Sequence, residues 1–222
     1  MNFFSLFKRN LIYKFKKKVF IDNKKIDDKS LDYLFNYFGS DKADYFNLKD
    51  TKGHGYSKFY QDHLGKFKNK SINILEVGSY AGASAAAFTK YFPNAKVFCF
   101  DINISNFKFS SKNIKVYGLD IKNEKKVVNI FQKIFKENKF EKFDIIIDDG
   151  SHNLKDILFG LKILFYYLNK EGVYIIEDFK FPNHFDYNKD IDDILVSDLI
   201  ENLKNKNFFQ SKILNQQDQL NM

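Results

Sequence analysis

Cysteine and long apolar runs are both scarce in this chain of 222 residues. The single cysteine, Cys99, excludes an internal disulfide and is expected to be a small core residue in a reducing compartment. No stretch approaches the roughly 18 apolar residues that a transmembrane helix needs, and lysines near the N-terminus interrupt any signal-peptide core. We therefore expect a cytoplasmic protein, for which peripheral contact with a membrane is left open.

Acidic residues are absent from the first 20 residues, which mix aromatic, aliphatic and basic side chains. Four apolar residues recur there at helical spacing, namely Phe4, Phe7, Leu11 and Phe15. A helix with such a stripe is able to rest on an anionic membrane, or to pack on its own domain or on a second subunit of a homo-oligomer. The sequence leaves these alternatives open.

The net charge of +8 raises the question of a nucleic-acid partner. The basic residues form no aromatic-interleaved platform and no recognisable nucleic-acid module. The Asn/Asp-Pro-Pro-aromatic motif of amino-methylating enzymes is absent as well. We therefore expect no nucleic-acid partner.

From residue 71 onward, short apolar runs alternate with helical segments, which predicts an α/β fold with a doubly wound, mostly parallel sheet. The predicted strands are 72–77, 96–100, 114–117, 143–147 and 173–176, and the predicted helices are 83–92, 122–138, 153–169 and 188–205. Upstream, Ser30 and Gly39 bracket a helix and a second helix spans about 57–64, with a polar loop between them. The predicted organisation is a basic amphipathic segment (1–27), a helical appendage (28–70) and a ligand-binding domain (71–222).

Acidic residues lie in, end or follow all five predicted strands. They are Glu76, Asp101, Asp120, the pair Asp148-Asp149 and the pair Glu177-Asp178. In an open α/β sheet the carboxyl ends of the strands line one crevice, and acids gathered there repel one another unless a cation binds them. The pattern predicts a ligand site at this edge of the sheet.

The first strand leads into a glycine turn, E-V-G-S-Y-A-G (residues 76–82), and then into a helix of small residues. The turn lacks the G-x-G-x-x-G pattern of a dinucleotide fingerprint, because Ser79 and Tyr80 follow Gly78. At the end of the next strand, Asp101 is suited to accept hydrogen bonds from two ribose hydroxyls.

The segment F-D-I-I-I-D-D-G-S-H (residues 143–152) is the most specific in the chain. Neighbouring strands would bring Asp149, Glu177 and Asp178 together as oxygen ligands of a hard divalent cation such as Mg²⁺. His152, close by, is then a candidate general base for a hydroxyl proton.

These motifs, together with the upstream G-S-D-K (39–42) and H-G-Y-x-x-x-Y (54–60), resemble the macrocin/mycinamicin O-methyltransferases. That family is Mg²⁺-dependent, uses S-adenosylmethionine (SAM) and methylates sugar hydroxyls. The resemblance covers about residues 34–180 and implies a class I methyltransferase fold. It places catalysis on His152, the metal on Asp149, Glu177 and Asp178, and acceptor or cofactor contacts on Tyr56 and Tyr60. SAM contacts would fall on Glu76, Gly78, Ser79, Gly82, Asp101, Asp120, Asp148 and Asp149.

The sequence departs from the family pattern in two places. After the third strand it reads G-L-D-I-K (118–122) where the family tends to show G-D-Q-x-D, and we find no sequence for the usual C-terminal strand hairpin. We expect a SAM- and Mg²⁺-dependent O-methyltransferase acting on a sugar hydroxyl of a polysaccharide precursor or glycosylated metabolite. The alternatives are a catechol-type small-molecule O-methyltransferase and a truncated, non-catalytic binding protein of the same fold.

Overall fold

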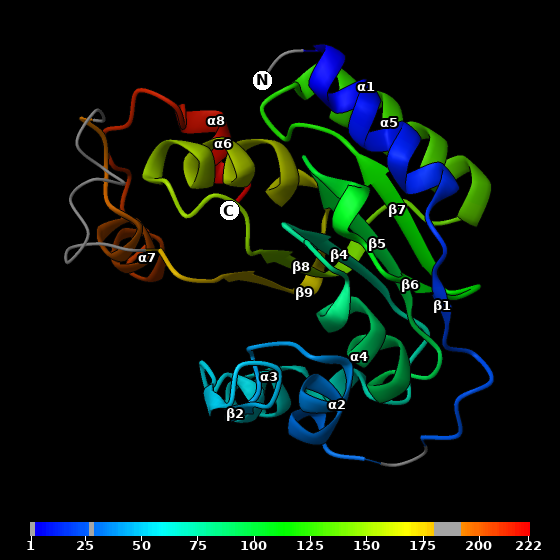
Figure 1. Ribbon diagram of the computed structural model, residues 1–222. Helices are drawn as coiled ribbons and strands as arrows, with labels where there is room; N and C mark the ends of the chain where they lie inside the picture. Colours follow the sequence, from blue (N-terminus) through cyan, green and yellow to red (C-terminus); the bar gives the residue numbers. More distant parts are fainter. Residues whose placement is uncertain (1–2, 27–28, 180–191) are drawn as a thin grey trace.

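The computed structural model describes residues 3–26, 29–179 and 192–222 and is built around a five-stranded parallel sheet (Figure 1). The strands are β4 (Asn73–Val77), β5 (Lys96–Asp101), β7 (Ile114–Gly118), β8 (Phe143–Asp148) and β9 (Leu168–Ile176). Their spatial order is β7-β5-β4-β8-β9. The chain thus runs outward from β4 to one edge and returns to the other side, which confirms the predicted doubly wound α/β fold.

The register aligns the carboxyl ends of the central strands. Val77 pairs with Phe100 and Asp148, and Asp148 pairs in turn with Ile176. The residues that follow these positions therefore emerge at one edge of the sheet, where the sequence predicted a ligand site.

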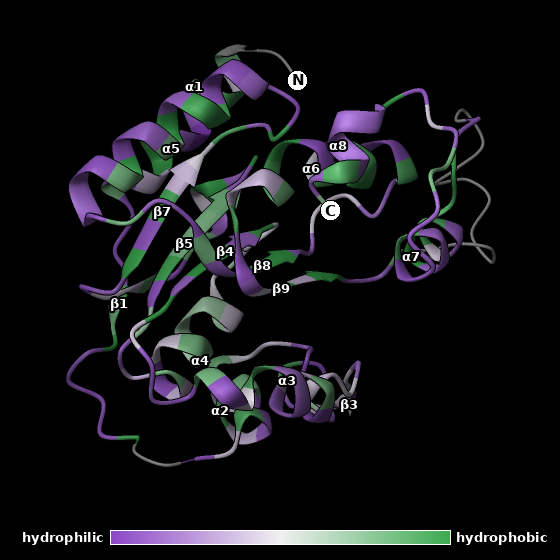
Figure 2. Ribbon diagram, turned by 180° about the vertical axis from the view of Figure 1, so that it is seen from behind, coloured by the Kyte–Doolittle hydropathy of each residue, from purple (hydrophilic) through white to green (hydrophobic). Residues whose placement is uncertain are grey.

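Helices cover both faces of the sheet (Figures 1 and 2). Successive strand residues alternate between the two cores, so that Ile74 and Ile145 join one apolar cluster while Leu75 and Ile146 join the other. The first cluster includes α4 with α2 and α3, and the second includes α5 and part of α6. These helices are α2 (Leu31–Phe38), α3 (Ser57–Leu64), α4 (Ala83–Tyr91), α5 (Glu124–Asn138) and α6 (Leu154–Leu164).

The fifth strand is longer than the sequence predicted. The predicted helix 153–169 ends earlier, as α6 and the short 3-10 turn η3 (Phe165–Tyr167), and β9 begins at Leu168. The side-chain amide of Asn169 donates to Asp144 Oδ1 at 2.7 Å and ties this polar stretch to the neighbouring strand. Because that contact is tertiary, the local pattern gave no sign of it.

The appendage packs tightly on the sheet domain. As predicted, the Ser30 hydroxyl caps α2 by accepting from the Tyr33 amide at 3.2 Å, and Gly39 ends the helix with φ of 80°. The predicted polar loop contains a small hairpin, β2 (Tyr45–Phe46) with β3 (Thr51–Lys52), and η1 (Gly65–Phe67) follows α3. Since Phe35 and Tyr60 pack against Phe88 of α4, the two parts share a core, and the boundary at residue 70 stays a prediction.

The N-terminal helix α1 (Phe3–Phe15) packs on η2 (Ile104–Asn106) and β7, and β1 (Val19–Phe20) pairs in parallel with β6 (Phe109–Ser110). At the other end, α7 (Val196–Lys204) packs with α6 around an apolar cluster that also includes Leu214, just before α8 (Gln216–Leu220). The start of the predicted helix 188–205 lies outside the described residues. Within the described ranges, no strand follows β9 and no helix is both long and apolar enough to cross a membrane.

Candidate active site

A cavity of about 700 Å³ opens at the carboxyl ends of β4, β5 and β8. Six of the residues predicted to contact a cofactor line it, namely Gly78, Ser79, Asp101, Asp120, Asp148 and Asp149. His152 lines the same cavity, as do Lys42 and Tyr80. The cavity therefore joins the glycine turn to four of the acids at the strand ends, while Glu76, Glu177 and Asp178 are outside its lining.

Glycine is required at position 78 by a close backbone approach. Gly78 has φ of 84°, and a Cβ added there would lie 1.8 Å from the backbone oxygen of Asp149. Gly82, by contrast, is outside the cavity lining; its missing Cβ makes room for the ring of Phe107, 2.3 Å from the Cβ position. Gly78 thus allows the first turn to lie against the backbone of Asp149, and Gly82 allows the ring of Phe107 to pack against the same turn.

The carboxylate of Asp101 is held in place by backbone amides. Its Oδ2 accepts from the Tyr80 amide at 2.7 Å, and its Oδ1 accepts from the Asn103 amide at 2.5 Å. Tyr80, which also lines the cavity, adopts a left-handed conformation with φ of 40°, and the residue is 66% exposed. These two hydrogen bonds fix the orientation of the carboxylate. Each oxygen still has a lone pair that can accept a further hydrogen bond.

Glu76 lies beneath the cavity rather than on its surface. It is fully buried, and its Oε1 accepts from the hydroxyl of Ser84 on α4. Burial raises the pKa of Glu76 to about 7, against the opposing effects of Lys42 and Ser84. The position indicates a role in the floor of the site, so its predicted contact with a cofactor stays a prediction.

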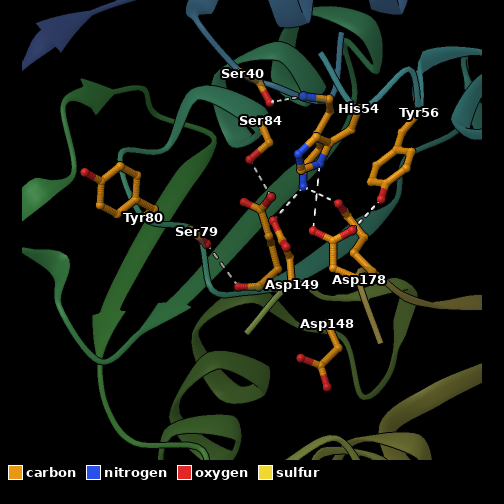
Figure 3. Close-up of polar contacts among 12 residues, drawn as sticks. Ser40, His54, Tyr56, Ser79, Tyr80, Ser84, Asp148, Asp149 and Asp178 are labelled. Carbon is orange, nitrogen blue, oxygen red and sulfur yellow. Dashed lines mark hydrogen bonds and ion pairs between the residues drawn. The ribbon is translucent and has the colours of Figure 1, made fainter. Parts of the chain in front are cut away.

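Asp149, His152 and Asp178 form a group that could hold a cation; Figure 3 shows the two carboxylates, Asp149 and Asp178, close together. One potential ligand atom from each lies within 4.8 Å of those of the other two. Asp149 Oδ1 is 4.0 Å from His152 Nε2. Both His152 (φ 59°) and Asp178 (φ 49°) adopt left-handed backbone conformations, which are uncommon for non-glycine residues and often occur at functional sites.

Lys42 was not predicted as a site residue, yet its ammonium group occupies the centre of the acidic cluster. Its Nζ lies 2.6 Å from Asp149 Oδ2 and 2.6 Å from Glu177 Oε2, and its side chain is 4% exposed. Burial opposes the charge, but Glu177 and Asp149 outweigh it and raise the pKa of Lys42. The G-S-D-K motif was the signal for this residue, although nothing in its spacing showed where the lysine would point.

Tyr56 and Tyr60, which were predicted to contact the acceptor or the cofactor, form hydrogen bonds with the carboxylates of Asp178 and Glu177. Tyr56 donates its hydroxyl to Asp178 Oδ1, and the fully buried Tyr60 donates to Glu177 Oε1. Neither lines the cavity. His54, also missed as a site residue, lies with its Nδ1 3.8 Å from Asp178 Oδ2. The appendage therefore supplies polar groups that orient the acidic strand ends.

Asp148 and Asp120 stand apart from this cluster. Asp148 points away from Asp149 and Asp178 (Figure 3), and burial raises its pKa to about 7 against the hydrogen bond from the Gly150 amide. Asp120, after β7, accepts from the Lys122 amide at 3.1 Å. The acids of the strand ends thus divide into a cluster around Lys42 and separate positions along the cavity.

The sheet order, the glycine turn after its first strand and the acid at the end of its second define the fold of a class I methyltransferase. The described chain superimposes on the MycE methyltransferase of the mycinamycin biosynthetic pathway, solved with Mg, SAH and mycinamycin VI. The TM-score is 0.61 at 20% sequence identity, over 79% of this chain and 48% of that one. This likeness supports the assignment of the fold.

Sequence comparison gives a consistent picture. The chain is 25% identical over 141 residues to the mycinamicin VI 2''-O-methyltransferase of Micromonospora griseorubida, covering 60% of this chain and 34% of that protein. It is 30% identical over 132 residues to the L-olivosyl-oleandolide 3-O-methyltransferase of Streptomyces antibioticus, covering 56% and 32%. No family model matches. The predicted resemblance to sugar O-methyltransferases is confirmed, while the chain spans about one third of the length of these relatives.

Proposed function

We propose that the chain is a SAM-dependent O-methyltransferase whose acceptor is a sugar hydroxyl. The observation that carries this proposal is the single cavity that joins the glycine turn and Asp101 to Asp149 and His152. The names of the relatives support the acceptor class, since the two quoted above methylate hydroxyls of glycosylated compounds. SAM would bind along the turn at 78–82 with its ribose near Asp101.

The donor set fits a divalent cation. Two carboxylates, Asp149 and Asp178, have oxygen atoms within 4.8 Å of each other and could share an ion, and Glu177 lies next in sequence to Asp178. Lys42 contributes one positive charge against Asp149, Glu177 and Asp178, so the cluster carries an excess of negative charge. Asp149 and Asp178 would hold Mg²⁺, with Glu177 as the further predicted ligand, and the bound ion would supply polarisation of the acceptor oxygens.

His152 is the proposed general base. Its imidazole lines the cavity, 77% of its side chain is covered, and the carboxylate of Asp149 at 4.0 Å stabilises the positive charge that the ring acquires with the acceptor proton. The hydroxyl oxygen would then attack the SAM methyl group while its proton passes to His152, the bond from the methyl carbon to sulfur would break, and S-adenosylhomocysteine would leave. The backbone amides of Tyr80 and Asn103 would hold the carboxylate of Asp101 in place for the proposed contact with the ribose.

Calorimetric titration of SAM with and without Mg²⁺, with NAD as the control ligand, tests the cofactor. Saturable binding of SAM but not of NAD is expected, and a folded protein that binds no SAM would overturn the proposal in favour of a non-catalytic binding protein. A methylation assay on a panel of glycosides and catechols then tests the acceptor. Turnover confined to catechols would contradict the sugar assignment.

The variants His152→Ala and His63→Ala form a matched pair for the base. His63 lies on α3, outside the cavity lining. The first substitution is expected to lower turnover by about 10²–10⁴-fold, the usual contribution of a general base, and to leave SAM affinity unchanged. The second should alter neither quantity. Unchanged turnover in His152→Ala would refute the role of this residue.

A further inference from the structure

The N-terminal helix α1 attaches to the sheet domain through its more polar face. Arg9 Nη1 donates to the Ile102 carbonyl at 3.2 Å, and Lys16 Nζ donates to the Ser105 carbonyl at 2.8 Å. Tyr13 packs edge-on against Phe107, with ring centroids 6.3 Å apart. Asn10 fits over Gly118, where an added Cβ would lie 2.2 Å from Asn10 Oδ1. This face is therefore built to match the surface beneath it.

The opposite face of α1 carries the apolar stripe that the sequence predicted. Phe7 is 58% exposed, Leu11 46% and Phe15 77%, and Phe4 at the start of the helix is 78% exposed. At 3.6 residues per turn these positions lie on one side of the helix, opposite Tyr13, while Asn10 lies on the flank. The helix thus docks on its own domain by one face and presents its aromatic side chains to solvent by the other.

The charges around this stripe favour an anionic partner. On a helical projection, Lys8 and Lys14 flank the apolar residues on either side, and Lys17 follows the helix; all three are exposed. Residues 1–20 contain no acid. Two copies of this face packed together would bring like charges close, whereas lysines beside an apolar stripe can extend their stems along it and place their ammonium groups among anionic headgroups.

We propose that the outer face of α1, formed by Phe4, Phe7, Leu11, Phe15, Lys8 and Lys14, binds the surface of an anionic lipid bilayer. The aromatic side chains enter the boundary between headgroups and acyl chains, and the lysines pair with lipid phosphates. The helix lies in the plane of the surface, and its inner face keeps it attached to the sheet domain. This inference is independent of the proposed methylation.

Vesicle co-sedimentation of the full chain tests the proposal. Binding to vesicles of mixed phosphatidylcholine and phosphatidylglycerol is expected, together with little binding to pure phosphatidylcholine and a loss of binding at high salt. The double variant Lys8→Gln/Lys14→Gln should bind about 20-fold or more weakly, since each lysine near an anionic surface contributes roughly five-fold. Lys133→Gln/Lys136→Gln on α5 removes the same charge elsewhere and should lose much less.

The triple variant Phe7→Ser/Leu11→Ser/Phe15→Ser tests the apolar part. It should keep the thermal unfolding midpoint of the parent, because these side chains are exposed, and should no longer sediment with vesicles. Phe59→Ser/Phe208→Ser, which alters exposed aromatic residues on other surfaces, serves as its control. Equal sedimentation of the triple variant and the parent would overturn the proposal. So would a concentration-dependent dimer of the parent that the triple variant abolishes, because the stripe would then belong to a second copy.

Discussion

Replacing Lys42 with methionine is the most informative single perturbation of this site. Methionine keeps much of the length and apolar character of the lysine stem but removes the ammonium group. The substitution removes the ion-pair partner of two carboxylates, Asp149 and Glu177, which each lie 2.6 Å from Lys42 Nζ. The side chain of Glu177 is only 4% exposed, so water has little access to its carboxylate, whereas the side chain of Asp149 is 23% exposed.

The expected destabilisation is large. Removing one partner of a buried ion pair typically costs about 3–5 kcal/mol, mostly because the remaining charge is left uncompensated. In a domain of this size each kcal/mol corresponds to roughly 2–4 °C in the midpoint of thermal unfolding, so a decrease of about 6–20 °C is expected. Circular dichroism during a thermal scan measures it directly.

Two comparisons separate charge from packing. The pair between Lys122 and Asp156 spans 3.2 Å, but the lysine is 49% exposed, so Lys122→Met should cost about 1 kcal/mol or less. In Lys42→Met, added Mg²⁺ should raise the midpoint more than in the parent, because the acidic cluster has lost the positive charge that contacts it. Equal destabilisation by the two substitutions, or no difference in the response to Mg²⁺, would refute the reasoning.

Three further predictions concern the floor of the site. Gly78→Ala should destabilise the fold by well over 1 kcal/mol in chemical denaturation because its Cβ meets backbone, whereas Gly65→Ala, with nothing within 4 Å of the Cβ, should change stability by less than about 1 kcal/mol. Because burial raises the pKa of Glu76 from 4.5 to about 7, the folded state binds more protons than the unfolded state between these values, so stability should fall by about 3 kcal/mol as the pH rises through this window. Glu76→Gln should reduce that dependence in unfolding curves from about pH 5 to about pH 8 and leave the part due to Asp148, whose pKa is raised in the same way; an unchanged slope would contradict the assignment. Asp101→Ala should weaken SAM binding in calorimetry at least ten-fold while Mg²⁺ binding persists; equal affinities would remove Asp101 from the cofactor site.

The structural role of the appendage follows from the same contacts. Lys42, Tyr56 and Tyr60 all come from residues before the first strand of the sheet, and all three contact carboxylates at the ends of β8 and β9. A segment that looks peripheral in the sequence therefore completes the acidic end of the cavity. We infer that the appendage and the sheet domain fold as one cooperative unit, which a single unfolding transition would support.

The sequence by itself determined the sheet and the edge at which the site lies. Apolar runs separated by helical segments specify a parallel sheet, and acids that directly follow such runs must emerge at its carboxyl edge. The turn containing Gly78 and the pair Asp148-Asp149 were placed correctly for this reason. The local signals at Ser30 and Gly39 also sufficed to bound α2, because capping depends on a few neighbouring residues.

Only the tertiary structure decided which groups face one another. Glu76 and Asp148 looked equivalent to Asp149 in the sequence, yet Glu76 is buried under α4 and Asp148 points away from the cluster. Lys42 lies more than 100 residues before its partners, and no periodicity records such a contact. The outward direction of the stripe on α1 was equally undetermined, because spacing shows that apolar residues share a face but not what that face meets.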